Sequence, residues 1–243
     1  MKCRPLLWFL CLLMIGLVLS CRSTDPIAKT PEEIAFAREA VLVMMEETLV
    51  AASGNISRPG GWTGTTADLV PSQAAVIVQR AQSVPGIPRL LSRYLGQMNE
   101  AVVRSVELLP EYLQKTVFPS LAIPDPFSLI EGEDDAVTRY FASIVYPTVE
   151  TWLESRLRGE EGKDALESWR ELLRTYHTYN RSQFLMRGTE SMFDGVEVNI
   201  DPIRSVVVTV LRLLLEDMRT QEALVRTMAP AYDNPLITLY VRP

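Results

Sequence analysis

The sequence predicts an all-α protein, a single helical-bundle-like domain of about seven or eight helices behind an N-terminal leader. Three observations lead to this prediction. Apolar residues recur every three or four positions through most of the chain after residue 30, which is the spacing of an amphipathic helix. Prolines and glycines divide this pattern into segments of helical length. Residues 30–243 show no internal repeat and no convincing domain boundary, so one domain is expected.

The composition is that of a globular protein with an acidic body. The chain has 243 residues, of which 47% are hydrophobic. At this length folding buries roughly 70% of the surface of the unfolded chain, so neither a disulfide nor a metal is needed for stability. The formal net charge is −6, and it becomes −8 if a leader takes Lys2 and Arg4 with it. An acidic body argues against nucleic-acid binding and against a polybasic membrane patch.

Cysteine and histidine are almost absent from the body. The three cysteines are Cys3, Cys11 and Cys21, and the single histidine is His177. Residues 22–243 therefore contain no thiol for a disulfide, a zinc site or a nucleophile. We expect the body to hold no metal and no other cofactor.

The first 20 residues predict a signal peptide. Lys2 and Arg4 form a positive start, and residues 5–19 are apolar apart from Gly16, in a run that is short for a membrane span. The run ends Val18-Leu19-Ser20-Cys21, which resembles a bacterial lipobox. In a lipobox an aliphatic residue, a spacer and a small residue precede the cysteine that receives a diacylglyceryl group.

Cys21 is accordingly expected to be the lipidated first residue of the mature chain. The predicted boundaries are a signal peptide over 1–20, the lipidated cysteine with a polar tether over 21–29, and the helical domain over 30–243. Several acyl chains anchor a protein to a membrane where one alone does not. The alternative is that Cys21 stands beside an ordinary cleavage site. The favoured interpretation places the protein in a bacterial cell envelope, on the periplasmic face or the cell surface.

The first helix of the body has a complete start signal. Thr30 can cap it, Pro31 suits its first position, and Glu33 completes a capping box. Its apolar pattern ends near Gly54, and a loop rich in Gly, Thr and Pro follows over residues 55–71. Trp62 in that loop is either a pin that holds the loop to the core, which we favour, or a platform for a ligand.

Prolines set the limits of the next segments. A helical pattern covers residues 72–83, and a longer one opens at Pro88. Pro110 is expected to end that helix and restart it. Asp125 is a natural cap for a single turn that runs through Ile130.

Residues 131–141 form the most informative stretch, an acidic turn followed at once by a helix. Asp134 or Asp135 is expected to cap this helix by accepting hydrogen bonds from exposed backbone N–H groups near its start. Pro147 lies inside the apolar pattern and predicts a kink or a restart at Tyr146. The predicted buried face consists of Val137, Phe141, Ile144, Thr148 and Trp152, with Tyr140 beside them.

Two further helices are expected in the last third of the chain. One covers about 164–180, and the most apolar one covers about 203–228 after a cap at Asp201. Residues 206–215 are apolar nearly all round, which predicts a central and largely buried position. Residues 236–241 have strand composition but no evident partner strand.

Residues 132–141 read Gly-Glu-Asp-Asp-Ala-Val-Thr-Arg-Tyr-Phe. This stretch resembles the Gly-x-Asp-Asp-Ala-Ala-Thr-x-Tyr-Phe signature of an uncharacterised bacterial family called domain of unknown function 4197. Residues 97–102 and 59–62 resemble two further segments of that family. The resemblance covers about residues 35–180, and the last third diverges. It implies a secreted or envelope protein and no particular activity.

The resemblance also marks six candidate site residues, whose role it leaves unknown and which we expect to be structural: Asn99, Asp134, Asp135, Thr138, Tyr140 and Phe141. Asn99 follows the core-facing Met98 in a strong helix. A buried asparagine commonly satisfies backbone groups of a neighbouring element, and a role in a site is the alternative.

Candidate chemistry is sparse. Glu131, Glu133, Asp134 and Asp135 could bind Ca²⁺ or Mg²⁺, or one of them could act as a general acid in sugar cleavage. Their spacing is not that of an EF-hand, and nothing in the sequence indicates the apolar pocket that raises the pKa of an acid. Helix capping on a solvated face is the favoured interpretation. His177 has no nucleophile motif beside it and is interpreted as structural.

Two functions from different classes follow. The favoured one is a membrane-anchored envelope lipoprotein without enzymatic activity, whose body binds an envelope protein or an apolar ligand or has a structural role. The alternative is a carboxylate-dependent enzyme that acts on an envelope polymer. An apolar groove would favour the first, and two carboxyl groups facing each other across a cleft would favour the second.

We predict that residues 22–243, made without lipid, unfold at the same temperature with and without a chelator or a reductant. The reason is that the body has one histidine and no thiol. Differential scanning calorimetry measures this directly. A chelator-induced fall of several degrees would restore the acidic cluster as a metal site.

Overall fold

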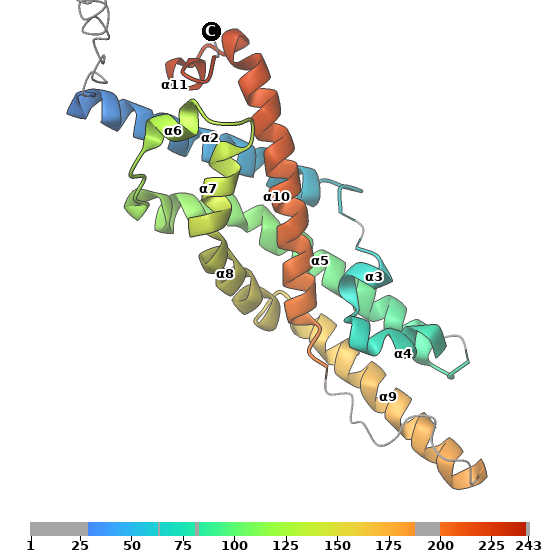
Figure 1. The fold of residues 1–243 in the computed structure, drawn as a ribbon. Helices are drawn as coiled ribbons and strands as arrows, with labels where there is room; N and C mark the ends of the chain where they lie inside the picture. Colours follow the sequence, from blue (N-terminus) through green and yellow to red (C-terminus); the bar gives the residue numbers. More distant parts are fainter. Residues whose placement is uncertain (1–28, 63, 81–82, 188–199, 242–243) are drawn as a thin grey trace, which may run out of the picture. The chain divides into compact units, whose positions relative to one another are not determined.

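The computed structural model describes residues 29–62, 64–80, 83–187 and 200–241 (Figure 1). The predicted signal peptide and Cys21 lie outside these residues. The described residues form α-helices and short 3-10 helices and contain no strand, which confirms the all-α prediction. None of the described helices is both long and apolar enough to cross a membrane. By internal contacts the chain divides into residues Met1–Ala35 and Phe36–Pro243, and each part is described by itself.

The described end of the first part holds the predicted capping box. The Thr30 N–H donates to the Glu33 carboxylate at 2.7 Å, and the Glu33 N–H donates to the Thr30 hydroxyl at 3.2 Å. The bond from the Thr30 backbone lowers the pKa of Glu33. Helix α2 starts directly behind this cap and spans Pro31–Ser57.

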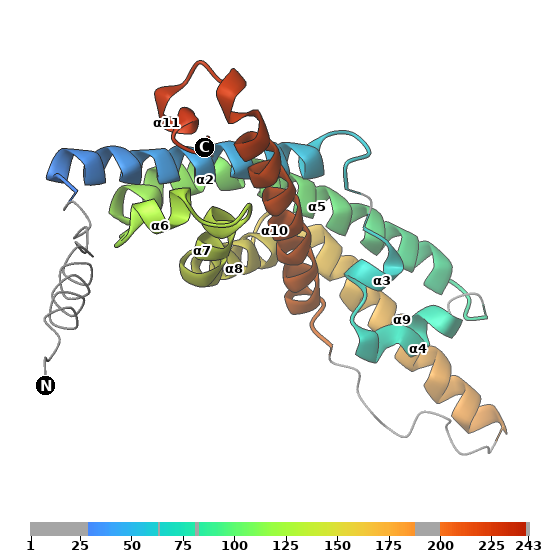
Figure 2. The ribbon, with the colours of Figure 1, turned by 45° about the horizontal axis from the view of Figure 1, so that its top comes forward.

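Long helices make up most of the second part, which takes in α2 from Phe36 onward. They are α5 (Ile87–Thr116), α9 (Lys163–Arg187) and α10 (Ile203–Met228). Helices α5 and α9 lie side by side, as Figures 1 and 2 both show. Tyr94 of α5 contacts Trp169 of α9 with ring centroids 4.9 Å apart. These long helices form the frame on which the shorter elements pack.

Helix α5 runs through Pro110 without a break, so the predicted restart there is wrong. A proline inside a helix removes one hydrogen bond and costs about 3 kcal/mol. The helix continues because the residues around the proline pack inward: Leu109 and Leu113 have no exposed surface. Burial of two leucine side chains contributes about 1.5–3 kcal/mol each, which offsets that cost.

Shorter helices complete the second part. They are α3 (Thr66–Leu69), α4 (Ala75–Arg80), α6 (Pro126–Ile130), α7 (Ala136–Ile144), α8 (Tyr146–Arg158) and α11 (Pro235–Thr238), with 3-10 turns at Ser72–Ala74, Phe118–Ser120 and Ala229–Ala231. Asp125 caps α6 as predicted, accepting from the Ser128 N–H at 3.2 Å. The chain restarts at Tyr146, ahead of Pro147, which confirms the predicted interruption.

The buried face of α7 and α8 differs from the predicted one at two positions. Ile144 is 52% exposed and Thr148 is exposed, although both were predicted to face the core. The buried positions are instead Val145, Val149, Leu153 and Leu157. The buried row thus runs from Val137 and Phe141 in steps of four residues through Val145 into α8, whereas the predicted face followed Ile144 and Thr148.

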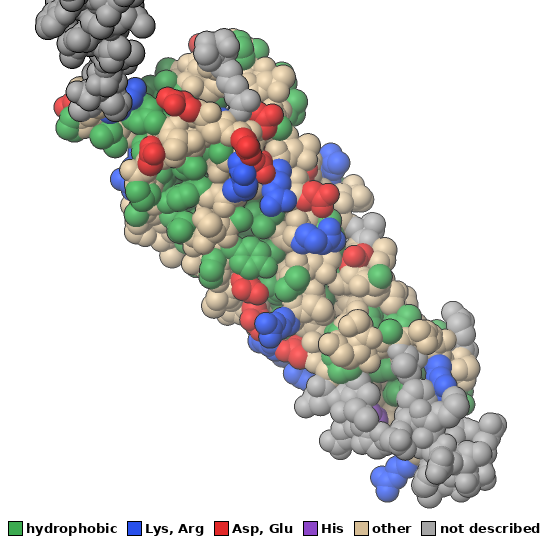
Figure 3. All heavy atoms as spheres, viewed as in Figure 1, with side chains coloured by type: hydrophobic (Ala, Val, Ile, Leu, Met, Phe, Trp, Pro, Cys, Tyr) green, Lys and Arg blue, Asp and Glu red, His purple; other side chains and the backbone are tan. Residues whose placement is uncertain are grey.

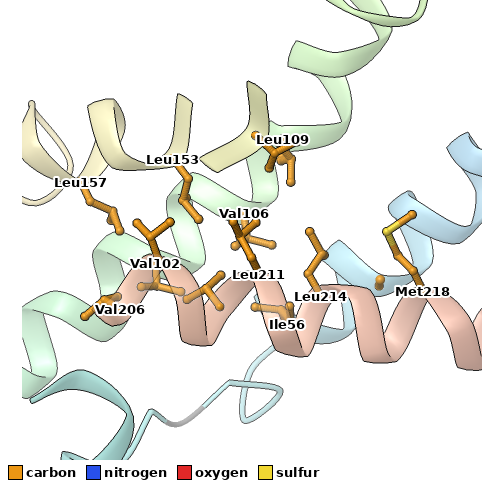
Figure 4. Packing of buried hydrophobic residues seen from close by; sticks show 14 of the residues in the cluster. Ile56, Val102, Val106, Leu109, Leu153, Leu157, Val206, Leu211, Leu214 and Met218 are labelled. Carbon is orange, nitrogen blue, oxygen red and sulfur yellow. The ribbon is translucent and has the colours of Figure 1, made fainter. Parts of the chain in front are cut away.

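Helix α10 is central, as predicted, but it is buried on one face only. Val208 is 46% exposed, which corrects the expectation of burial nearly all round. Its inner face meets side chains from α2, α5 and α8 (Figure 4). The residues drawn there include Ile56, Val102, Val106, Leu109, Leu153, Leu157, Val206, Leu211, Leu214 and Met218.

The C-terminal segment is a helical turn rather than the strand that its composition suggested. Asn234 caps α11 by accepting from the Leu236 N–H at 2.9 Å, and Pro235 takes the first helical position. Ile237 and Tyr240 are buried, and the Tyr240 hydroxyl donates to the Ala40 carbonyl at 3.2 Å. The described residues offer no strand edge for this segment to pair with, so the cap decides its conformation.

Replacing two glycines by alanine should change the stability in opposite directions. A Cβ at Gly162 would lie 1.9 Å from the Leu157 carbonyl oxygen, whereas a Cβ at Gly96 in α5 would meet nothing within 4 Å. We predict that Gly162→Ala lowers the free energy of unfolding and that Gly96→Ala raises it by about 0.5–1 kcal/mol. Urea unfolding of both variants measures the difference, and a stabilising Gly162→Ala would contradict the backbone path at this turn.

Candidate functional site

The start of α7 meets a buried carboxylate from α10. Glu222 has no exposed surface. Its carboxylate accepts from the Val137 N–H at 3.0 Å, from the Thr138 N–H at 2.7 Å and from the Thr138 hydroxyl at 2.8 Å. The first N–H groups of a helix have no partner within the helix, and a negative charge there interacts favourably with the helix dipole. Glu222 therefore caps α7 from a distant part of the sequence.

The predicted cap is consequently wrong for Asp135. Asp135 occupies the N-cap position, but its side chain makes no capping hydrogen bond. Its backbone, with φ −125° and ψ 18°, lacks the extended conformation usual at that position. The Asp135 carboxylate turns outward instead and pairs with Arg139 at 3.0 Å and with Arg219 at 3.8 Å.

Arg226, one turn after Glu222, continues the network to α6. Its guanidinium donates to the Glu222 carboxylate at 2.7 and 3.0 Å. It also donates to the carbonyls of Leu129 and Ile130 at 2.8 Å each. These carbonyls end α6, where a positive charge is favoured. The Glu222–Arg226 pair thus holds the end of α6 and the start of α7 together.

The pair is buried on all sides. The Glu222 and Arg226 side chains are 0% and 3% exposed, and the guanidinium lies 4.7 Å from the ring centroid of Tyr240. Burial raises the pKa of Tyr240, with Arg226 opposing the shift and Glu222 adding to it. Removing two charges from water is costly, and this pair recovers the cost through its several hydrogen bonds to backbone and side chain.

A hollow of about 340 Å³ lies beside the pair. It is lined by Asp134, Arg226, Thr227, Pro230, Tyr240 and Val241. The hollow thus lies between the acidic turn before α7 and the C-terminal segment. Its lining is of mixed polarity and has a single acidic residue.

Charged side chains of both signs cover the surface where α7 meets α10 (Figure 3). Arg139 bonds to Glu133 at 2.7 Å in addition to Asp135. These side chains are about one third to three quarters exposed, so each pair contributes little to stability. The acidic turn is a solvated surface held by arginines, which agrees with the solvated face favoured from the sequence but not with capping by Asp135.

Asn99 holds the loop before α3, as the sequence predicted. Its amide accepts from the Gly64 N–H at 2.8 Å and donates to the Gly64 carbonyl at 3.2 Å. A Cβ at Gly64 would come within 2.8 Å of that amide and 2.7 Å of the Trp62 ring, so any larger residue would displace one of these side chains. Trp62 is half-buried and packs on the core, in the manner expected of a pin for this loop.

The remaining candidates are also structural. Phe141 is 1% exposed and belongs to the core. Tyr140 is half-buried at the edge of the core, and its hydroxyl donates to the Ala122 carbonyl. The half-buried His177 has the Tyr176 ring edge-on, with ring centroids 6.2 Å apart. Within the described ranges no group of three or more His, Cys, Asp or Glu side chains could hold a metal ion.

A comparison with family models gives one match. The family described as "Protein of unknown function (DUF4197)" matches residues 38–238. The chain belongs to this family. The match runs past residue 180, where the resemblance was expected to end, and includes all of α10 with Glu222 and Arg226. Neither a search of curated proteins nor a search of solved structures found a match.

Glu222 and Arg226, which organise the signature of this DUF4197 protein, were not among the predicted site residues. A signal was nevertheless present. Met218, Glu222 and Val225 follow the buried stripe of α10, so a carboxylate stands where the helical period requires a core residue. Arg226 follows at the i, i+4 spacing at which a glutamate and an arginine on one helix pair.

We predict that Glu222→Ala lowers the free energy of unfolding by about 3–5 kcal/mol, because it leaves the buried Arg226 unpaired and α7 uncapped. Asp135→Ala removes only exposed pairs and costs about 1 kcal/mol or less. Urea unfolding of residues 22–243 with each substitution measures both values. A larger loss in Asp135→Ala than in Glu222→Ala would show that Asp135 is the cap after all.

Proposed function

We propose that this protein is a lipid-anchored protein of the bacterial cell envelope whose helical body is a non-enzymatic binding or structural module. The observation that carries the proposal is the run Val18-Leu19-Ser20-Cys21 behind a short apolar leader. A cysteine acylated at that place becomes the first residue of the mature chain. Its acyl chains, at about 0.8 kcal/mol for each buried CH₂, anchor the body to one face of a membrane.

The use of the signature's polar atoms supports a module without catalysis. Thr138 donates both its N–H and its hydroxyl to Glu222. The Asn99 amide is hydrogen-bonded to the Gly64 backbone, and the Tyr140 hydroxyl donates to a carbonyl. A catalytic acid, base or nucleophile must reach substrate atoms within hydrogen-bond distance. These groups instead fix loops and helix ends in place.

The site geometry gives no support to the enzyme alternative. Cleavage of a glycosidic bond uses two carboxyl groups on opposite sides of the scissile bond. The hollow beside the Glu222–Arg226 pair has one acidic residue in its lining, Asp134. Glu222 cannot serve as the second, because its oxygens accept five hydrogen bonds from Val137, Thr138 and Arg226. The proposed partners are the membrane and, for the body, an envelope protein or an apolar ligand.

Lipidation is tested with Cys21→Ala in a bacterial host. We predict that the native protein partitions into the detergent phase and begins at an acylated Cys21, because the acyl chains supply the membrane affinity. Cys21→Ala accumulates as precursor or is released from the membrane. Phase partitioning and intact-mass spectrometry measure both. Normal membrane retention of Cys21→Ala, together with an unmodified native mass, would refute the proposal.

A further inference from the structure

Five large apolar side chains are exposed on the segments around the C-terminus and the start of the second part. They are Phe36 (42% exposed), Met228 (47%), Tyr232 (37%), Leu239 (37%) and Val241 (42%). Single exposed apolar residues are common on soluble proteins and need no explanation. These five differ because direct contacts join the segments that carry them. We call them the apolar rim.

Contacts around Tyr240 bring the rim together. The Tyr240 hydroxyl binds the Ala40 carbonyl at 3.2 Å, and Phe36 lies one helical turn before Ala40 on the same stripe of α2. The Tyr240 ring packs on Arg226, two residues before Met228. Val241 lines one hollow with Pro230, which lies in the 3-10 turn Ala229–Ala231. The end of α10, α11 and the first turns of α2 after residue 35 therefore meet at one place.

The chain length ties this place to the proposed anchor. Residues 22–35 connect Cys21 to Phe36. Fourteen residues span at most about 50 Å when fully extended. This span is the longest distance by which the tether can separate Cys21 from Phe36, and Val208 of α10 lies about 30 Å along that helix from Met228. A tether of this length raises the local concentration of the membrane at the rim. Weak apolar contacts are therefore enough to hold the rim at the bilayer.

Among the residues that the structure describes, the charges near the rim form no basic patch for anionic lipids. Glu39 and Asp233 are exposed beside rim residues, and Asp134 lines the hollow. The nearby Arg226 is buried in its pair with Glu222, and Arg38 donates to the Leu121 carbonyl. Side chains such as Phe, Met, Tyr and Leu can enter the boundary between lipid headgroups and acyl chains without a basic patch.

We infer that the apolar rim inserts into the membrane interface and orients the body on the bilayer. The inference rests on the proposed anchoring through Cys21 and adds a second, apolar attachment of stated residues. Its partner is the lipid bilayer itself. The contact is insensitive to salt, because apolar burial and not charge supplies it.

The test uses the full mature protein, acylated at Cys21 and reconstituted in vesicles of phosphatidylethanolamine and phosphatidylglycerol. Acylated Cys21 leaves no free thiol in the mature chain, so Met228→Cys and Leu239→Cys each carry one site for an environment-sensitive fluorophore. Val208→Cys, 46% exposed on the same helix as Met228, is the matched control. All three positions are exposed, so the label leaves the core intact, and circular dichroism verifies this.

Vesicles with brominated acyl chains then report contact with lipid. We expect emission at positions 228 and 239 to fall about twofold, in low and high salt alike, and emission at position 208 to stay unchanged. If the brominated lipid changed the emission equally at all three positions, in vesicles that carry the protein, the inference would be overturned and the anchor would stand. A protein that fails to float with vesicles would overturn both. Shielding of the rim probes without quenching, with crosslinked dimers, would assign the rim to a second copy and also overturn the inference.

Discussion

The buried pair of Glu222 and Arg226 decides how the middle of the chain is arranged. Helices α6 and α7 are short, and the turn between them leaves carbonyls at one helix end and N–H groups at the other without partners inside the helices. Arg226 takes the carbonyls and Glu222 takes the N–H groups. The two charges also pair with each other. Either charge buried alone would be destabilising, whereas the complete network is stable.

This arrangement explains the composition of the family signature. Thr138 adds a hydroxyl to the bonds that Glu222 receives, and Phe141 anchors the helix in the core. Asp135 lies outside the network and pairs with arginines on the surface. The signature stretch therefore has a buried set of residues that builds the fold and an exposed set that pairs at the surface.

A second cluster with the same logic fixes the loop between α2 and α3. The Asn99 amide of α5 binds both the N–H and the carbonyl of Gly64, and the Trp62 ring lies beside that glycine. Tyr94, also on α5, adds a bond from its hydroxyl to the Leu69 carbonyl at 2.5 Å, and burial raises its pKa. Polar side chains of long helices thus hold the irregular backbone of their neighbours.

The sequence by itself determined what depends on neighbours a few residues apart. The capping box of Thr30 and Glu33, the cap by Asp125 and the interruption ahead of Pro147 all follow from local bonds, and each was predicted. The predicted lipidation of Cys21 is also a local pattern, and it lies outside the described residues.

The tertiary structure alone decided what depends on partners far along the chain. Glu222 caps α7 across a separation of 85 residues, and Tyr240 reaches Ala40 across 200. Packing also carried α5 through Pro110 and left Ile144 exposed. The reason is physical: a helix end accepts any donor or acceptor of the right charge, and only the folded chain determines which one reaches it.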